Sequence, residues 1–215
     1  MMISPNSLVF VIDDDPSVRK GLTRLLRSAG YKNEIFESAS DFLKREQYPG
    51  PACVIVDVRM PGLNGMDLQE ALIQRRRKEQ LIFITGHGDI SMCAQAMKAG
   101  AVDFLPKPFR DDELLGCVER SLIRSAEQHR RSAEEDEART LLGLLTPREL
   151  EVMQLVVTGM LNKQIAGELG AAEKTIKVHR GRAMRKLNVT SVAELVRLTE
   201  KACLAPSLTP KTKVS

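Results

Sequence analysis

The chain has 215 residues, of which 43% are hydrophobic and 28% are charged, a composition typical of a globular protein with room for two domains. It has no apolar run long enough to span a bilayer, and its start, MMISPNSLVF, lacks the basic and then apolar regions of a secretion signal. We therefore expect a cytoplasmic protein without a membrane partner. The four cysteines are far apart and form no CxxC pair, which favours reduced thiols over a disulfide framework or a zinc site.

The net charge of +4 is distributed unevenly along the chain. Residues 1–124 carry 17 basic and 17 acidic side chains, whereas residues 144–215 carry 12 basic and 6 acidic ones. A neutral part joined to a basic part indicates that only the second part meets a polyanion such as a nucleic acid.

Short apolar runs alternate with amphipathic stretches over the first 125 residues. The runs predict strands at 8–12, 34–36, 53–56, 81–85 and 102–105. The stretches between them predict helices at 16–29, 39–46, 65–76, 89–99 and from 111 onward. Apolar strands separated by helices are typical of a parallel sheet covered on both faces. We therefore expect residues 1–125 to form a doubly wound, five-stranded α/β domain, which collects ligands at the carboxyl ends of its strands.

The last of these helices continues into the charged segment AEQHRRSAEEDEART at 126–140. This segment predicts a helical linker over 126–143, either exposed to solvent or acting as a coiled-coil spacer. From residue 144 the pattern is entirely helical, with helices expected near 146–158, 162–169, 173–187 and 191–202. We expect an all-α domain of four helices over 144–204, followed by a disordered tail at 205–215.

Polar residues that could take part in a reaction lie where the predicted strands of the first domain end. Asp13 and Asp14 follow the first strand, Asp57 follows the third, Thr85 ends the fourth and Lys107 follows the fifth. Carboxylates that converge at one edge of a sheet repel one another unless a cation lies among them, and oxygen ligands without Cys or His favour Mg²⁺. A hydroxyl and an ammonium nearby could hold the oxygens of a phosphoryl group. Joint placement at neighbouring strand ends therefore favours Asp57 as a phosphoryl acceptor over an ordinary turn residue.

Residues 8–125 resemble the receiver domain of two-component response regulators. The matching stretches are VIDDDPSVRKGL, VIVDVRMPGLNGMDL, FITGHGD and AMKAGAVDFLPKPF. The resemblance implies that Asp57 accepts a phosphoryl group from a sensor histidine kinase. It also implies that Mg²⁺ is held by Asp13, Asp14, Asp57 and the main-chain carbonyl of Arg59.

Further roles follow from the same resemblance. Thr85 and Phe104 match the switch pair, in which the hydroxyl turns toward the phosphate and the ring moves inward. Lys107 matches the lysine that binds the phosphoryl oxygen, and its bond to Pro108 matches a cis peptide. An alternative is a phosphatase of the haloacid-dehalogenase type, because Asp13 and Asp15 resemble its nucleophile and general acid. That alternative leaves Asp57 without a role.

The helix expected at 173–187, EKTIKVHRGRAMRKL, places Ile176, Ala183 and Leu187 on one face and basic residues on the other. A short helix ending at Gly170 precedes it, and this arrangement is typical of a helix-turn-helix motif. A solvated charged helix is the alternative for this segment alone. In a helix-turn-helix the second helix enters the major groove of DNA.

The stretches LTPRELEVMQLVVTGMLNKQIAGELG and KTIKVHRGRAMRKLNVTSVAELVRL resemble the LuxR-type DNA-binding domain. Joined to a receiver, this domain resembles the NarL/FixJ subgroup, and within it FixJ-like regulators of catabolic operons. Lys177 and Val178 are the base-reading candidates by this resemblance. The remaining candidates for DNA contact are Lys163, Lys174, Thr175, Arg180, Gly181, Arg182 and Arg185.

Two departures from the family pattern concern this domain. Gly181 stands where many members have a longer side chain, so a base contact is lost there or passes to Arg182. Met160 and Leu161 precede Asn162 where a small polar residue is usual.

The expected function is therefore a transcription factor rather than an enzyme, which dimerises on phosphorylation through its receiver and last helix. It would bind an inverted repeat in promoter DNA and contact RNA polymerase. The alternative is a constitutive DNA-binding protein whose receiver only binds other proteins.

Overall fold

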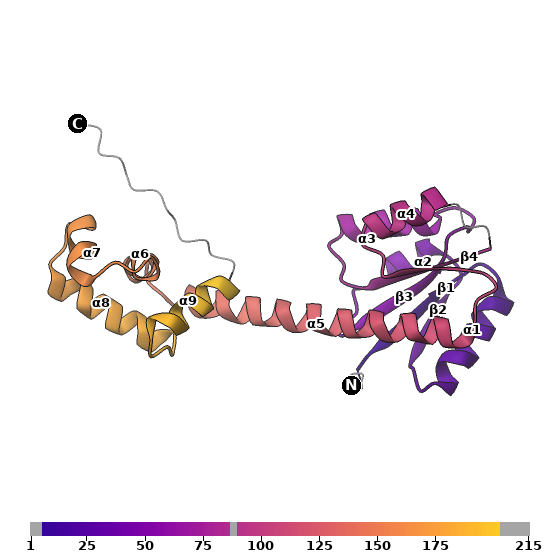
Figure 1. The fold of residues 1–215 in the computed structure, drawn as a ribbon, viewed down its shortest axis with the longest axis horizontal. Coiled ribbons are helices and arrows are strands. Elements are labelled where there is room, and N and C mark those ends of the chain that lie inside the picture. The colour runs from indigo at the N-terminus through magenta and orange to yellow at the C-terminus, as the bar shows by residue number, and fades with distance from the viewer. Residues whose placement is uncertain (1–5, 87–89, 203–215) are drawn as a thin grey trace. The chain divides into compact units, whose positions relative to one another are not determined.

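The computed structural model describes residues 6–86 and 90–202 (Figure 1). The chain forms two compact units, Met1–Arg130 and Arg131–Ser215. The tail at 205–215, for which we expected disorder, lies outside the described residues. Within the described ranges, no helix is both long and apolar enough to cross a membrane.

Strands and helices alternate through the first unit, as the sequence predicts. In chain order they are β1 (Leu8–Ile12), α1 (Pro16–Ser28), β2 (Asn33–Phe36), α2 (Ala39–Lys44), β3 (Ala52–Asp57), α3 (Gly65–Gln74), β4 (Gln80–Thr85), α4 (Ile90–Lys98), β5 (Asp103–Pro106) and α5 (Asp111–Gly143). The described strands form one parallel five-stranded sheet in the order β2-β1-β3-β4-β5. The expected doubly wound α/β class is confirmed.

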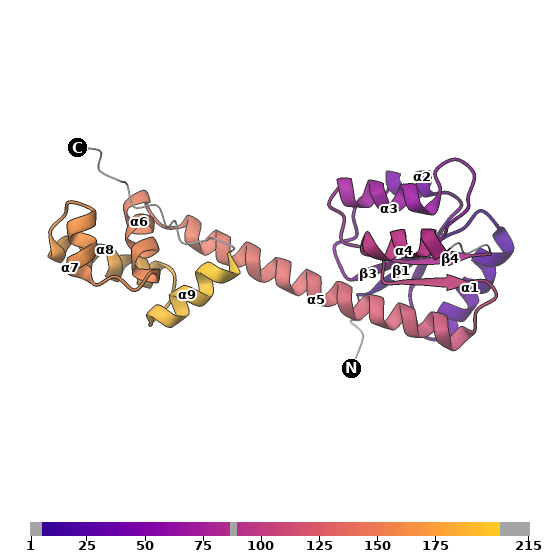
Figure 2. The same cartoon turned by 45° about the horizontal axis from the view of Figure 1, so that its top comes forward.

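Helices cover both faces of this sheet because its central strands are apolar on both sides. One core joins alternate residues of the strands, such as Phe10 and Phe83, to α2, α3 and α4. The other joins the remaining alternate residues, such as Val11 and Ile55, to α1 and α5. Figures 1 and 2 show α3 and α4 on one side of the sheet and α1 and α5 on the other. Each fully buried Phe or Ile contributes about 1.5–3 kcal/mol to folding, so β1, β3 and β4 are a rigid platform for the strand ends.

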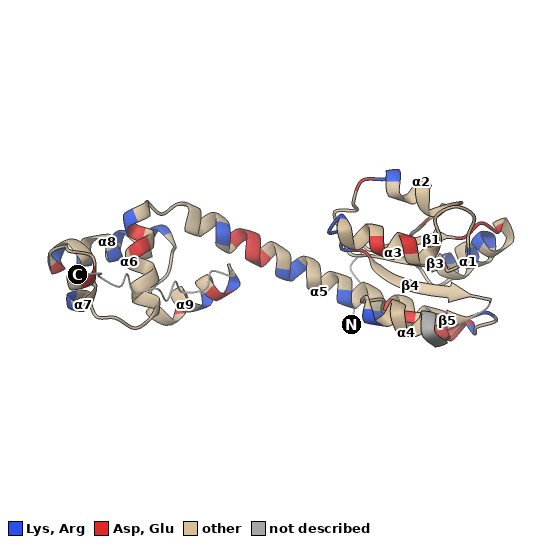
Figure 3. Cartoon of the chain, turned by 90° about the horizontal axis from the view of Figure 1, so that it is seen from above, with Lys and Arg blue, Asp and Glu red and all other residues tan. Residues whose placement is uncertain are grey.

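Helix α5 extends for 33 residues and contributes to the cores of both units. Leu114 and Leu122 are buried in the first unit, whereas Ala138 and Leu142 are buried in the second. The segment expected to be an exposed or coiled-coil linker is helical and mostly exposed, but Ala138 and Leu142 are buried, which the sequence did not predict. These two residues are four apart and therefore share one face of the helix. Charged residues, blue and red in Figure 3, alternate with uncharged ones along this part of α5.

In the described part of the second unit, four further helices follow α5. They are α6 (Pro147–Val157), α7 (Asn162–Glu168), α8 (Glu173–Lys186) and α9 (Val192–Lys201). Helix α6 begins with the predicted capping box, in which Thr146 Oγ1 accepts from Glu149 N and Glu149 Oε2 accepts from Thr146 N. Val152, Ile165, Ile176 and Leu195, one from each helix, meet in the core. The expected all-α class is confirmed.

Candidate functional site

The sheet order brings the predicted phosphoryl site together at the carboxyl ends of the strands. β3 pairs with β1 on one side and with β4 on the other. Asp13 directly follows β1, and Asp57 is the last residue of β3. Lys107 follows β5 and its main-chain N–H donates to the carbonyl oxygen of Thr85, the last residue of β4, at 2.6 Å.

Lys107 connects the two aspartates. Its Nζ donates to Asp13 Oδ2 at 2.8 Å and to Asp57 Oδ2 at 3.0 Å. The Asp13 side chain is fully buried, and that of Asp57 is 14% exposed. The remaining oxygens accept from the backbone: Asp13 Oδ1 from Asp15 N at 2.9 Å and Asp57 Oδ1 from Arg59 N at 3.2 Å. Asp57 thus lies at the surface end of a buried charge network.

Burial and pairing act in opposite directions on the charged groups of this network. Burial raises the pKa of the Asp13 carboxyl, although the hydrogen bond from Lys107 opposes it. For Lys107, burial alone would lower the pKa, but its hydrogen bonds to Asp13 and Asp57 outweigh burial and raise the pKa above its ordinary value. The ammonium group is therefore firmly protonated near neutral pH and offsets part of the repulsion between the carboxylates.

The donor atoms fit a hard divalent cation. Asp13, Asp14 and Asp57 offer carboxylate oxygens that all lie within 4.8 Å of one another. Oxygen donors of this kind suit Mg²⁺. Asp14 is exposed, and Arg59, whose carbonyl is the fourth expected ligand, is exposed as well. The residues present are therefore suited to Mg²⁺.

The switch candidates lie on the same half of the sheet. Thr85 is buried at the end of β4, next to the pair formed by Asp57 and Ile84. Phe104 in β5 is half-buried, with its ring centroid 6.1 Å from that of Phe83. The Lys107–Pro108 peptide bond is cis.

Asp15, to which the family resemblance gives no role, begins helix α1. Its Oδ1 accepts from Ser17 N at 2.7 Å, and Pro16 occupies the first turn. The sequence does contain this signal, because an aspartate directly before a proline is typical of a helix N-cap. The local hydrogen bonds to Ser17 also lower the pKa of the Asp15 carboxyl.

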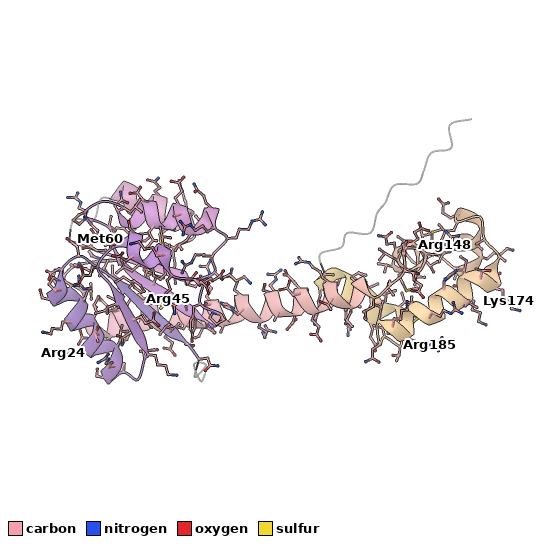
Figure 4. The ribbon with its side chains drawn as sticks, turned by 180° about the vertical axis from the view of Figure 1, so that it is seen from behind. Arg24, Arg45, Met60, Arg148, Lys174 and Arg185 are labelled. Carbon is pink, nitrogen blue, oxygen red and sulfur yellow. The ribbon has the colours of Figure 1, made fainter. Side chains whose placement is uncertain are left out.

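The candidate DNA interface is formed by α7 and α8. Ile176 and Ala183 of α8 are buried, which leaves the opposite face of the helix exposed. Figure 4 marks Lys174 near one end of α8 and Arg185 near the other. The exposed candidates of the two helices are Lys163, Lys174, Thr175, Lys177, Val178, Gly181, Arg182 and Arg185.

Three other basic side chains of this region hold the domain together. Arg180 is half-buried, and its Nη1 donates to Asn162 Oδ1 at 3.1 Å, so this DNA-contact candidate also joins α8 to α7. Arg148 Nη2 donates to the carbonyl of Leu169 at 2.8 Å, at the end of α7. Lys186 Nζ donates to Glu149 Oε2 at 2.6 Å, and this bond, together with the main-chain N–H of Thr146, lowers the pKa of Glu149 to about 2.

Comparison with known proteins identifies two families in the chain. Residues 9–119 match the response regulator receiver domain, and residues 143–199 match the bacterial regulatory proteins of the luxR family. The receiver match favours this family over the dehalogenase-type phosphatases.

Several relatives match this chain over nearly its full length, and so over both domains. "Nodulation protein W" of Bradyrhizobium diazoefficiens is 45% identical and the match covers 98% of this chain and 93% of the relative. "Transcriptional regulatory protein FixJ" of Azorhizobium caulinodans is 41% identical, over 94% and 97%. The solved structure of response regulator StyR is 50% identical, with a TM-score of 0.80 over 91% of this chain and 98% of that one. The chain therefore belongs to the NarL/FixJ subgroup of two-component response regulators, transcription factors with a receiver domain and a LuxR-type helix-turn-helix domain.

Proposed function

We propose that phosphorylation of Asp57 controls promoter binding by this transcription factor. The observation that carries the proposal is the cluster of Asp13, Asp14 and Asp57 oxygens within 4.8 Å, with Lys107 bonded to two of the three. We assign residues 1–125 to the phosphoacceptor domain, 126–143 to the connection and 144–204 to DNA binding. Because promoter DNA is the target, we place the protein in the cytoplasm.

In the proposed reaction, an Asp57 carboxylate oxygen attacks the phosphorus of a phosphohistidine on a partner kinase. An O–P bond forms as the N–P bond breaks, and the histidine leaves with the electron pair. Asp13, Asp14, Asp57 and the carbonyl of Arg59 would hold Mg²⁺, which when bound neutralises charge on the phosphoryl oxygens. Lys107, already hydrogen-bonded to Asp57, would donate to one phosphoryl oxygen, and the Thr85 hydroxyl would donate a hydrogen bond to another.

The change then passes to the rest of the receiver. The hydroxyl of Thr85 turns toward the phosphoryl group and the ring of Phe104 moves inward, which resets the surface of α4, β5 and α5. This surface and α9 support a homodimer. A two-fold dimer reads an inverted repeat, with half-sites about one turn of DNA apart.

For the DNA complex, Lys177 and Val178 supply base contacts and the surrounding basic side chains contact phosphates. If six to eight phosphates are neutralised per dimer, affinity falls on the order of 10³-fold between 50 and 200 mM salt. Resemblance to FixJ-like regulators supports activation of transcription through RNA polymerase, with a catabolic operon as the target.

Labelling with acetyl phosphate tests the chemistry. We expect Mg²⁺-dependent labelling of the intact chain and none of Asp57→Asn, because only the nucleophile forms the covalent bond. Asp13→Asn should keep some labelling at high Mg²⁺. Labelling that survives in Asp57→Asn and disappears in Asp13→Asn would refute the assignment.

Promoter binding tests the switch. Phosphorylated wild-type protein should dimerise and bind its promoter more tightly than Asp57→Asn. Equal dimerisation and affinity of the two would support the alternative, a constitutive DNA-binding protein with a receiver that binds other proteins.

A further inference from the structure

Arg19 is a buried cation to which the proposed reaction gives no role. It lies in the first turns of α1, and its side chain is only 10% exposed. A guanidinium is charged at any pH that the protein meets, and burying it is unfavourable unless its donors are bonded. The hydrogen-bond partners of Arg19 therefore indicate which part of the structure it stabilises.

Two of these contacts are to the residues of the proposed Mg²⁺ site. Arg19 Nη1 donates to the main-chain oxygen of Asp13 at 2.7 Å and to that of Asp14 at 2.9 Å. Arg19 Nη2 donates to Glu37 Oε1 at 3.1 Å. One guanidinium thus holds two successive carbonyls of the turn that leads from β1 to α1.

The carbonyls are the stronger partners. The Glu37 side chain is 80% exposed, and an ion pair so exposed contributes little because water screens it. By contrast, Asp13 is fully buried, so loss of Arg19 would leave its carbonyl without this charge-assisted bond in a place that excludes water. A substitution of Arg19 therefore acts mainly through the carbonyls of Asp13 and Asp14.

The side chain of Asp13 is held from other directions. Its carboxylate accepts from Asp15 N and from Lys107 Nζ, while Arg19 holds its main chain. The main-chain carbonyl of Asp14 is held by the same guanidinium. Rotation of either residue about its backbone would move its carboxylate relative to Asp57.

We infer that Arg19 is a positioning residue for the Mg²⁺ site: by holding the carbonyls of Asp13 and Asp14 it sets where their carboxylates meet Asp57. This inference rests on the proposed function, because it assumes that these carboxylates bind Mg²⁺. Groups that orient metal ligands typically change metal affinity by about 10–100-fold when they are removed.

The charge of Arg19 and its hydrogen bonds to the turn act on Mg²⁺ affinity in opposite directions. A fixed positive charge near a cation site weakens cation binding, so a side chain that acted by charge alone would oppose Mg²⁺. Both carbonyls accept from the one nitrogen Nη1, while Nη2 donates to Glu37. Lysine keeps the charge, but its side chain is one bond shorter and flexible, so it cannot place its nitrogen between the two carbonyls as the rigid guanidinium does. The pair Arg19→Gln and Arg19→Lys therefore separates the two effects.

The experiment measures Mg²⁺ affinity in the full chain. The dissociation constant is taken from the rise of the unfolding temperature with Mg²⁺ concentration, which separates affinity from the stability of the metal-free protein. We expect Arg19→Gln to bind Mg²⁺ about 10–100-fold more weakly, and Arg19→Lys to be weakened as well. The control Glu37→Gln, which removes only the exposed partner, should stay within about twofold of wild type. Acetyl-phosphate labelling of Arg19→Lys should recover at saturating Mg²⁺.

Two results would overturn the inference. A lower unfolding temperature with an unchanged Mg²⁺ dissociation constant would make Arg19 a structural residue only, and tighter Mg²⁺ binding in Arg19→Gln would make it an electrostatic one. If Arg19→Gln does not fold, Arg19→Lys decides. Wild-type protein that binds no Mg²⁺ and is not labelled would refute the proposed function itself, whereas unchanged variants beside a labelled, Mg²⁺-binding wild type refute the inference alone.

Discussion

Gly65, the first residue of α3, lies against the backbone of Asp57, the proposed phosphoacceptor, and Gly65→Ala should therefore destabilise the receiver domain. A Cβ at this position would be 2.6 Å from the main-chain oxygen of Asp57 and 3.1 Å from Val58 Cα. Asp57 ends the central strand β3 and Val58 follows it directly; because β3 is hydrogen-bonded on both sides, neither atom can move aside without a large cost. Gly65 N also donates to the carbonyl of Val58 at 3.0 Å, which holds the two segments together.

The magnitude follows from two opposing effects. Overpacking of this kind costs about 1–3 kcal/mol, whereas alanine gains about 0.4–1 kcal/mol from the lower entropy of the unfolded chain. The steric effect dominates, so we expect a net loss of about 1–2 kcal/mol and a fall in the unfolding temperature of roughly 4–8 °C. A displacement of Asp57 by part of an ångström should also slow labelling by acetyl phosphate, on the order of tenfold.

The assay uses the tyrosines, because Tyr31 and Tyr48 both lie in the first unit and report its unfolding. Gly21→Ala in α1 is the matched control. Among the described residues, a Cβ at Gly21 would meet no heavy atom within 4 Å, so this variant should gain about 0.5–1 kcal/mol. The reasoning is refuted if Gly65→Ala unfolds at or above the wild-type temperature and is labelled at the wild-type rate.

The remaining predictions concern the DNA-binding unit. Leu161 is the N-cap residue of α7, and within the described part of the chain its side chain makes no capping hydrogen bond. Leu161→Ser should therefore raise the free energy of unfolding, measured in urea, by about 0.5–2 kcal/mol. Gly181→Ala in α8 should raise it by about 0.5–1 kcal/mol, and an unchanged midpoint would contradict this. Glu149, with a folded pKa of about 2 against an ordinary 4.5, stabilises the fold above pH 4.5 and loses that effect as the pH falls toward 2. Glu149→Gln should therefore unfold at a lower temperature than wild type at pH 7, and calorimetry should find the gap closing between pH 4.5 and 2.

Much of the site could be predicted because it depends on strand ends. Apolar runs place Asp13 and Asp57 at the ends of neighbouring strands, and the parallel order then brings them together without knowledge of any side-chain contact. Arg19 could not be found in this way. It lies between the inward positions Val18 and Leu22, yet a charged residue there reads as part of the surface, since its partners are carbonyls that only the folded turn presents.

The same limit explains other errors and omissions. Ala138 stands within a charged run and Leu142 follows it, and the burial of both depends on helices that come later in the chain. The bond between Lys186 and Glu149 joins residues 37 apart, and local spacing predicts only the capping role of Glu149. Local spacing therefore does not predict a contact between distant segments when one partner already has a satisfactory local role.

The contribution of α5 to two cores affects how such regulators can be recombined. A chimera that joins a foreign receiver to this chain at residue 144 would omit Ala138 and Leu142 and leave the recipient core short of two buried side chains. It would also omit the ion pair between Glu134 and Lys201 of α9. A junction placed before Arg131 keeps all of these contacts. For this architecture, exchangeable modules therefore begin within a helix, and a shuffled regulator must preserve its helical phase across the junction.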